Sequence, residues 1–275
     1  MSSCVIISGM QKIINAHCHI YPPDIAERAV AGISEFYHIK IDLNGRTDGL
    51  IEDGQKAGVV HYLVHSVATK PAQVTNINNF IASEVKQHPD LFTGFGTLHP
   101  DSENLEGDLK HLIELGLKGV KIHPDFQFFS LAEERAIRLG QMVRDAGLPI
   151  LTHCGDFRFK LSNPDQLEVF LRELPGLTVI GAHLGGWSKW DEVEQKIAGK
   201  YDMYVDTCSS LRFMDKDVAV RLMRKFGTDK VLFATDYPTW DHASELKLMD
   251  ELDLTESERE QIFYTNAAKL LGLGE

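Results

Sequence analysis

Two histidines separated by one residue, His17 and His19, have the residue type and the spacing of a metal-binding pair. They end an apolar run, KIINAHCH, whose composition predicts a β-strand. Side chains on a strand alternate between its two faces, so both imidazoles are expected on one face and Cys18 on the other. Two imidazoles on one face can share a divalent cation at ~2.0–2.1 Å from each nitrogen. Taken alone, however, a His-x-His pair is a weak indication of a metal site.

Other polar side chains follow other apolar runs along the chain. Seven of the 12 histidines fall at the ends of predicted strands, together with two aspartates. These residues are His17, His19, His65, His99, His123, His153, His183, Asp206 and Asp236. The runs that carry them occupy residues 12–19, 59–66, 92–100, 117–124, 148–155, 177–185, 202–207 and 230–238. Because the carboxyl ends of parallel strands meet at one rim of a barrel, this pattern predicts that the side chains converge on one site.

Segments with apolar residues at helical spacing separate the eight runs, which is typical of alternating strands and helices. Eight strands, each followed by a helix, predict an α/β fold with a single (β/α)8 TIM barrel over residues 1–275. A doubly wound open sheet is the alternative, but no Gly-x-Gly-x-x-Gly or phosphate-loop pattern follows any run. The segment 255–271 is expected to add a closing helix pair. Residues 1–10 are expected to be a short flexible or non-native leader, with Met10 as the original start.

Local signals predict where two of the helices begin or end. One helix is expected over Ser130–Ala146, because Ser130 and Glu133 have the spacing of a capping box and Gly147 is a typical stop. The sequence Asn163-Pro164 opens the next helix in a similar way.

The composition excludes several classes of protein. The chain has 275 residues, 43% of them hydrophobic, and 28 basic against 40 acidic side chains give a net charge of −12. Such acidity disfavours a large nucleic-acid surface, and no apolar run reaches the roughly 18 residues that a membrane-spanning helix needs. The amino terminus lacks a secretory signal, and the four cysteines form no Cys-x-x-Cys pair. We therefore expect a cytoplasmic protein with reduced thiols that acts on a small molecule, without nucleic-acid or membrane partners.

Four motifs in a fixed order resemble the amidohydrolase superfamily. They are INAHCH, THCG, GAHLGG and FATDYP, followed by NAAKLLGL near the carboxyl end, and the resemblance spans Lys12 to Leu273. It is strongest to the amidohydrolase-related branch, which holds small metal-dependent hydrolases and aminocarboxymuconate-semialdehyde-type decarboxylases. The resemblance implies a (β/α)8 barrel, a homodimer and His183 close to a metal-bound water. The metal ligands that it implies are His17, His19, His153 and Asp236.

The chemistry of these side chains agrees with that set. Three neutral imidazoles and one carboxylate suit one divalent metal, for which Zn²⁺ is expected and Mn or Fe are alternatives. Such a cation would activate water at neutral pH, while Asp236 would take up the proton and pass it to the leaving group. His183 would orient the water or stabilise oxyanion charge. A second metal bridged by a carboxylated Lys121, as in dihydroorotase-like members, is the less favoured arrangement.

Residues on the predicted loops suggest what the substrate carries. Arg158, Lys160 and Arg212 lie on loops expected to overhang the mouth, and an Arg fork there would bind a substrate carboxylate. Trp187 is expected to wall the pocket and His123 to contact the substrate. Asp206, by contrast, is interpreted as a structural partner for a loop or as a hydrogen-bond acceptor behind the ligands, rather than as a ligand. His65 and His99 are interpreted as hydrogen-bonded rim residues.

Three functions remain open at this point. A metal-dependent hydrolase acting on an amide, ester or lactone is favoured, because the chain is compact and lacks long extra loops. The alternative is a non-oxidative decarboxylase of an unsaturated or aromatic acid. A catalytically silent, metal-stabilised binding protein is the third, and the presence of both His183 and Asp236 argues against it.

Overall fold

The structure, a computed structural model, describes residues 12–274, so the expected leader over residues 1–10 lies outside the described residues. All strand pairs in it are parallel, and they form one sheet in the order β1-β2-β3 and another in the order β4-β5-β6-β7-β8-β9. The strands are β1 (Ile13–His19), β2 (Val59–His65), β3 (Phe92–Gly94), β4 (Gly96–Thr97), β5 (Val120–Ile122), β6 (Ile150–Thr152), β7 (Val179–Gly181), β8 (Tyr204–Asp206) and β9 (Val231–Leu232).

The two sheets join at both edges and close into a barrel. β3 and β4 are one segment interrupted at Phe95, so the third predicted strand spans both sheets. At the other edge the Ala16 amide donates to the Phe233 carbonyl at 2.9 Å, and the His19 amide donates to the Tyr237 carbonyl at 2.7 Å. All eight predicted runs are thus strands of one closed ring, which confirms the predicted (β/α)8 barrel.

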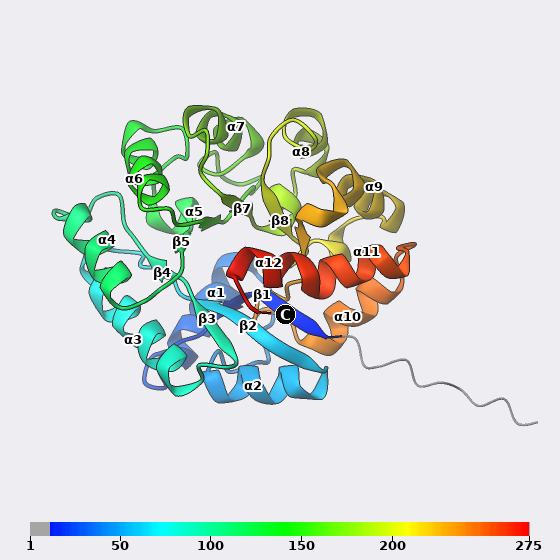
Figure 1. Cartoon of the computed structure of the whole chain (residues 1–275), viewed down its shortest axis with the longest axis horizontal. Coiled ribbons are helices and arrows are strands. Elements are labelled where there is room, and N and C mark those ends of the chain that lie inside the picture. The colour runs from blue at the N-terminus through cyan, green and yellow to red at the C-terminus, as the bar shows by residue number, and fades with distance from the viewer. Residues whose placement is uncertain (1–11, 275) are drawn as a thin grey trace, which may run out of the picture.

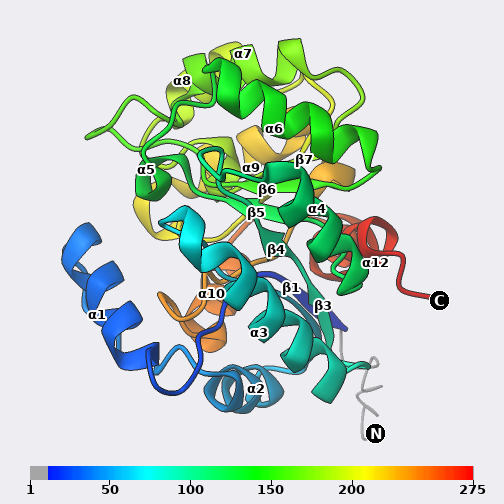
Figure 2. The same ribbon diagram turned by 90° about the vertical axis from the view of Figure 1, so that its left-hand side faces the viewer.

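Helices surround the ring and cover its two ends (Figure 1). Figure 2 shows α1 and α5 at one end of the barrel and α12 at the opposite end. The α-helices are α1 (Ala26–Tyr37), α2 (Thr47–Lys56), α3 (Val74–Gln87), α4 (Leu105–Glu114), α5 (Pro124–Gln127), α6 (Glu134–Asp145), α7 (Pro164–Glu173), α8 (Trp190–Lys196), α9 (Lys216–Phe226), α10 (His242–Asp250), α11 (Glu256–Glu260) and α12 (Asn266–Leu271). None of the helices within residues 12–274 is long and apolar enough to cross a bilayer.

The helix ends agree with the local signals in part. α7 begins at Pro164 with Asn163 as its N-cap, as predicted, and Gly147 after α6 has a φ of +72°, which suits a helix stop. The capping box at Ser130 is only half present. The Glu133 carboxylate accepts from the Ser130 amide at 3.0 Å, but Glu133 is itself the N-cap, so α6 starts later than expected.

The carboxyl-terminal segment differs from the expected helix pair. α11 runs through a π-helical turn over Gln261–Thr265 directly into α12, and the residues at both junctions keep right-handed helical dihedrals. The segment is therefore one interrupted helix, which lies across the end of the barrel where the amino termini of the strands meet (Figure 1).

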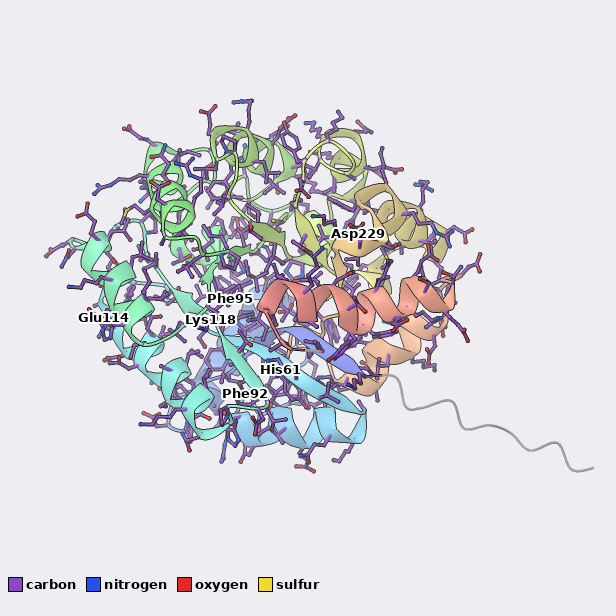
Figure 3. The ribbon with its side chains drawn as sticks, in the orientation of Figure 1. His61, Phe92, Phe95, Glu114, Lys118 and Asp229 are labelled. Carbon is purple, nitrogen blue, oxygen red and sulfur yellow. The ribbon has the colours of Figure 1, made fainter. Side chains whose placement is uncertain are left out.

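The apolar core has two layers. An outer layer fills the space between the strands and the surrounding helices, whereas a smaller cluster fills the barrel itself. That inner cluster contains Ile14, Ala16, Leu63, Phe95, Leu151, Ile180, Ala182, Leu232, Ala267 and Ala268. Phe95, labelled in Figure 3, lies inside the ring and is fully buried. The last two alanines come from α12, so this helix closes one end of the interior and the polar site occupies the other.

Candidate active site

A β-bulge in β1 turns His17 and His19 into the barrel. Asn15 pairs with Tyr62 and Cys18 pairs with Val64, so three steps along β1 match two along β2. Ile14 and Ala16 point into the interior before the bulge, and simple alternation would have sent Cys18 inward. Cys18 instead lies in the outer layer, as the sequence predicted, and both imidazoles line the cavity at the barrel mouth.

His17, His19 and Asp236 bring three ligand atoms together at the mouth. The His17 and His19 Nε2 atoms are 3.2 Å apart, and they lie 3.4 Å and 3.6 Å from Asp236 Oδ1. A tetrahedral ion with bonds of ~2.0–2.1 Å has ligand atoms about 3.3 Å apart. The spacing of these three atoms therefore fits one divalent cation.

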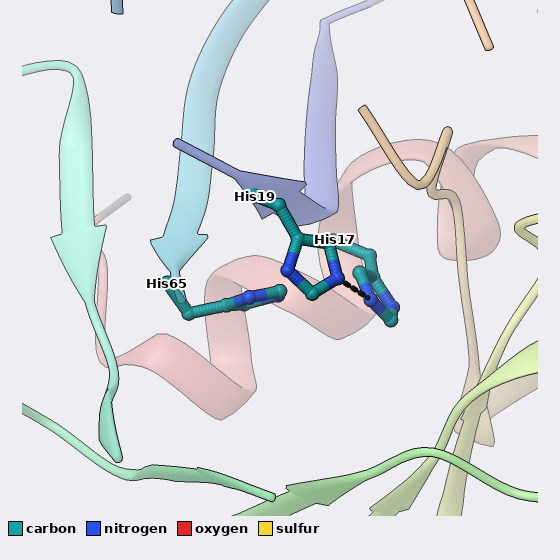
Figure 4. Close-up of side chains that lie close together, drawn as sticks. All are labelled: His17, His19 and His65. Atoms are coloured by element: carbon teal, nitrogen blue, oxygen red, sulfur yellow. Dashed lines mark hydrogen bonds between the residues drawn. The ribbon is translucent and has the colours of Figure 1, made fainter. Parts of the chain in front are cut away.

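His65 adds a third imidazole next to this pair (Figure 4). Its ring centroid lies 4.5 Å from that of His19 and 4.8 Å from that of His17. Both of its ring nitrogens are buried and have no hydrogen-bond partner among the described residues. The interpretation of His65 as a hydrogen-bonded rim residue is therefore wrong, because β2 ends with this side chain inside the cluster rather than beside a polar partner.

Asp206 sets the tautomer of His17. The His17 Nδ1 donates to Asp206 Oδ2 at 2.7 Å, which leaves the Nε2 lone pair directed at the cluster. The same carboxylate accepts from the backbone amide of His183 at 2.9 Å. Asp206 thus stands behind two of the predicted site residues, which is the second of the two alternatives left open by the sequence.

His153 and His183 form a second pair beside the first. His153 Nε2 lies 2.8 Å from the Gly155 carbonyl, and His183 Nδ1 lies 3.1 Å from the Cys208 carbonyl. If each of these nitrogens donates to its carbonyl, then His153 Nδ1 and His183 Nε2 face one another at 3.0 Å as two acceptors. A shared proton or a nearby cation would relieve the repulsion between the two lone pairs. This pair is therefore also suited to binding a cation.

Burial keeps the imidazoles neutral near pH 7. It lowers the pKa of His183 to about 4 and places the pKa values of His17, His19 and His153 well below the usual range, where the charge of Lys121 lowers them further. Burial raises the pKa of Asp236 to about 7, against the hydrogen bond that Ser209 donates to it at 2.7 Å. Neutral imidazoles are the form that binds metals, and a carboxyl group with a pKa near 7 can both take up and release a proton.

Two of these residues adopt unusual backbone dihedrals. Asp236 and His183 have a φ of +60°, in the left-handed region where residues other than glycine carry a cost of roughly 1–2 kcal/mol. His183 lies two residues after β7 and Asp236 four residues after β9, and both line the cavity at the mouth of the barrel. Such strain persists only where the surrounding structure imposes it, and it is concentrated at functional sites.

A cavity of about 620 Å³ opens from the cluster. Its inner end is lined by the site histidines, Asp236 and the buried Lys121, whose Nζ lies 3.1 Å from His17 Nε2. His123 lies on the wall, stacked on His153 with ring centroids 3.9 Å apart, and the Tyr37 hydroxyl lies 3.1 Å from its Nε2. His123 therefore lies where the sequence placed it, within reach of a bound molecule.

The two arginines expected to bind a substrate carboxylate lie elsewhere. Arg158 makes a two-pronged ion pair with Asp156, at 2.7 Å for the closest contact, and packs on the ring of Phe36. Arg212 pairs with Glu245 and lies over the ring of Trp240. Neither arginine lines the 620 Å³ cavity. Their guanidinium groups are already neutralised by carboxylates of this chain, so their positions do not support the predicted fork.

Trp187 contributes to an aromatic rim rather than to the cavity wall itself. Its ring lies 5.6 Å from that of Tyr37 and 6.2 Å from that of Phe213, centroid to centroid, and it lines a small recess between them. The Phe213 ring is in turn 6.3 Å from that of Trp240.

Several residues around the cavity were missed by the sequence analysis. Lys121 was considered only as a carboxylated bridge, although its place two residues before His123 put it on the inward face of β5. No pattern in the sequence points to Tyr37, which reaches the site from α1, or to Ser209. Cys208, with its Sγ 3.4 Å from His17 Nδ1, follows Asp206 by two residues and could have been found by strand alternation.

The donor set as a whole is consistent with a divalent metal. Two groups of three ligand atoms lie within 4.8 Å of one another. One group comes from His17, His19 and His65, and the other from His17, Cys208 and Asp236. The imidazole lone pairs and the Asp236 carboxylate suit Zn²⁺ or a similar first-row cation. The fourth predicted ligand, His153, lies beside this set, in contact with His183.

Comparisons with known proteins agree with the fold and the residue pattern. A family model described as amidohydrolase matches residues 14–273. A search of the curated proteins finds no match.

Solved structures of similar fold cover nearly the whole chain. An uncharacterized TIM-barrel protein from Bordetella bronchiseptica has a TM-score of 0.76 at 16% identity, over 95% of this chain and 98% of that one. A dihydroxybenzoic acid decarboxylase from a Polaromonas species, with bound manganese and the inhibitor 2-nitroresorcinol, has a TM-score of 0.72 at 15% identity, over 97% and 98%.

A putative 2-pyrone-4,6-dicarboxylic acid hydrolase from Pseudomonas putida is also similar in fold, with a TM-score of 0.68 at 15% identity, over 95% of this chain and 98% of that one. With the family match over residues 14–273, the barrel and the histidines at its mouth lead to one conclusion: this chain belongs to the amidohydrolase family.

Proposed function

We propose that the protein is a metal-dependent hydrolase that cleaves an amide, ester or lactone of a small molecule. The observation that carries the proposal is the group of three ligand atoms from His17, His19 and Asp236, at 3.2–3.6 Å from one another, facing a cavity of substrate size. When bound there, a divalent cation such as Zn²⁺, Mn²⁺ or Fe²⁺ would act as a Lewis acid and lower the pKa of a water molecule.

Four side chains around the cluster would bind the substrate, orient the water and transfer the proton. Ser209 holds Asp236 by Oδ2, so Oδ1 faces the cluster, where it would hold the metal weakly and take the proton of the attacking water. The Ser209 hydroxyl in turn accepts from the Trp240 indole at 2.9 Å, which fixes its orientation. His183 Nε2, which is an acceptor when Nδ1 donates to the Cys208 carbonyl, would orient the water by accepting a hydrogen bond from it. Lys121 would attract the negative charge of the substrate from the cavity floor.

Decarboxylation is the second candidate. The observation in its favour is the largely apolar wall of the cavity, because a medium of low dielectric destabilises the localised charge of a carboxylate more than the dispersed charge that stays on the substrate carbon as neutral CO2 departs. The solved dihydroxybenzoic acid decarboxylase of similar fold is consistent with it. In that reaction Asp236 would deliver the proton to the carbon atom from which CO2 departs.

Elemental analysis of protein purified without added metal tests the metal centre. We expect about one equivalent of a first-row metal per chain, lost in His17→Ala and retained in His111→Ala, whose imidazole lies on α4 away from the cavity. Absence of metal from the wild type even after reconstitution would contradict the proposal. Two equivalents would favour a carboxylated Lys121 instead.

Isotope labelling separates the two reactions once a substrate is found among lactones, amides and aromatic acids. A hydrolase incorporates ¹⁸O from labelled water into its product, whereas a decarboxylase releases CO2 and takes up solvent deuterium on carbon. In either case Asp236→Asn is expected to lower kcat by about 10²–10⁴-fold while the fold is retained. Unchanged turnover in this variant would rule out the role assigned to Asp236.

A further inference from the structure

The cavity extends well beyond the polar cluster, to the surface between α1 and α3. Its outer part is lined by one face of α1 and by the start of α3 with the turn before it. Figure 2 shows α1 at the edge of the molecule, standing off from the ring of helices that covers the barrel. The single cavity therefore joins a polar floor to a channel between two helices.

The side chains facing this channel are mostly apolar. On α1 and just before it they recur at helical spacing, and they are Ile25, Ala29, Gly32, Ile33 and Phe36. From the opposite side come Ala72, Ile77 and Phe80. Arg28 also lines this stretch and is exposed on α1, so its charge can stay in water while its stem covers the apolar wall.

The apolar face of α1 does not pack against the barrel core. The helix is held in place by contacts with loops and with residues at its end. Its buried Val30 packs over the loop at Gly45, outside both layers of the core: a Cβ added to Gly45 would lie 2.7 Å from the Val30 side chain. The end of α1 is fixed by Tyr37 on His123 and by Arg158, which donates to the Phe36 carbonyl. Ile25 and Ile33 are thus left half-exposed towards the channel. An apolar group bound there would remove their surface from water, which is favourable.

We propose that this channel binds the apolar chain of an amphipathic acyl compound, whose acyl head, released by hydrolysis as a carboxylate, lies at the polar floor beside Lys121. The inference rests on the proposed function, because it assigns the reacting head group to the cluster of His17, His19 and Asp236. The channel selects a substrate with an aliphatic or arylalkyl chain of several carbons over a compact polar acid. Each methylene that enters the channel strengthens binding about fourfold.

Gly32 allows a direct test. Gly32 lines the cavity and a Cβ added there meets nothing within 4 Å, so we expect the side chain of Gly32→Leu to reach into the channel, and leucine favours a helix more than glycine does. Ala31→Leu is the matched control, because Ala31 is the adjacent residue of α1, is exposed and does not line the cavity. Gly32→Ala serves as the mild variant. Circular dichroism melts check that each variant folds.

The measurement is isothermal titration calorimetry with acetate, butanoate, hexanoate and octanoate. In the wild type and Ala31→Leu we expect affinity to rise about fourfold per added methylene until the channel is filled. In Gly32→Leu that rise stops at a shorter chain, while the affinity for acetate stays unchanged. Gly32→Ala is expected to keep most of the rise.

Affinity independent of chain length in the wild type overturns the proposal, as does a failure of every carboxylate to bind. The same dependence of affinity on chain length in Gly32→Leu and Ala31→Leu also overturns the proposal. Titration with 1-alkanols of the same chain lengths distinguishes recognition of the chain from recognition of the carboxylate. An affinity that rises with chain length for alkanols but not for carboxylates overturns the assignment of the carboxylate to the polar floor. Calorimetry measures binding and needs no turnover. If the protein proves to lack metal or hydrolase activity, the dependence of affinity on chain length therefore still tests the channel.

Discussion

At the scale of single residues, Asp206 links the two histidine pairs of the site. Its Oδ2 accepts from His17 Nδ1, and its Oδ1 accepts from the His183 amide and from the Cys208 thiol at 3.0 Å. One buried carboxylate therefore sets the tautomer of one imidazole and the backbone position of another. Such partners behind a metal ligand raise its basicity and hold its ring in place.

Replacing this carboxylate gives the first prediction. Asp206→Asn keeps the shape but removes the charge, so we expect the affinity for Zn²⁺ to fall by about 10–100-fold. Competition with a chromogenic chelator measures the change. Asp202→Asn is the control, since Asp202 is an exposed residue just before β8 that pairs with Lys230. Equal zinc affinity in both variants would show that His17 does not need Asp206.

At the scale of elements, side-chain caps decide where the last helical segment begins. The Thr255 hydroxyl accepts from the Glu258 amide at 3.2 Å, while the Glu258 carboxylate accepts from the Thr255 amide at 2.8 Å, which completes a capping box. The carboxylate also pairs with Arg224 of α9 at 2.7 Å. This start matters because the same helical run continues to α12, which closes the barrel interior.

A prediction about pH follows from this cap. Hydrogen bonds from Arg224 and Thr255 lower the pKa of Glu258 to about 2, from an ordinary value of 4.5. A lowered pKa in the folded state means that the stabilisation is complete above pH 4.5 and is lost as the pH falls towards 2. Glu258→Ala is therefore expected to lower the free energy of unfolding by about 1 kcal/mol at pH 7, with part of the ion-pair contribution screened by solvent.

Urea unfolding at several pH values between 7 and 3 measures this difference. We expect the gap between wild type and Glu258→Ala to narrow as the pH falls below 4.5. Glu260→Ala is the control, because Glu260 is exposed on the same helix. A gap that stays constant down to pH 3 would mean that the charge of Glu258 contributes nothing.

At the scale of the whole molecule, the apolar interior and the polar site share the barrel but occupy opposite ends. Leu63, Phe95 and Leu151 fill the middle, with α12 below them and the histidine cluster above. The strands are therefore held from inside by residues that take no part in the chemistry. A rigid interior of this kind positions the groups at the strand ends that would bind a metal.

The interior is expected to dominate stability. Phe95→Ala removes a fully buried ring and leaves a cavity, so the free energy of unfolding should fall by about 3–5 kcal/mol. Phe128→Ala, at a ring that is 75% exposed, should change it by no more than about 0.5 kcal/mol. Urea denaturation compares the two variants. Similar losses would mean that Phe95 does not support the barrel.

Much of this molecule is determined by local sequence. The strands and helices follow from hydrophobic periodicity, and helix starts such as Asn163-Pro164 follow from the preference of proline for the first helical turn, because both depend on residues close together in the chain. The convergence of the strand-end histidines follows in turn, since eight parallel strands in a closed barrel bring their carboxyl ends to one rim.

Tertiary structure alone decided the rest. Whether Arg212 is free for a substrate depends on Glu245, which lies 33 positions further along the chain, and no periodicity reveals that pairing. The bulge that turns His17 inward arises from the pairing of β1 with β2, and the channel arises because α1 is held away from α3. These features come from contacts between distant segments, whose energies depend on shape and burial in the folded chain rather than on any local pattern.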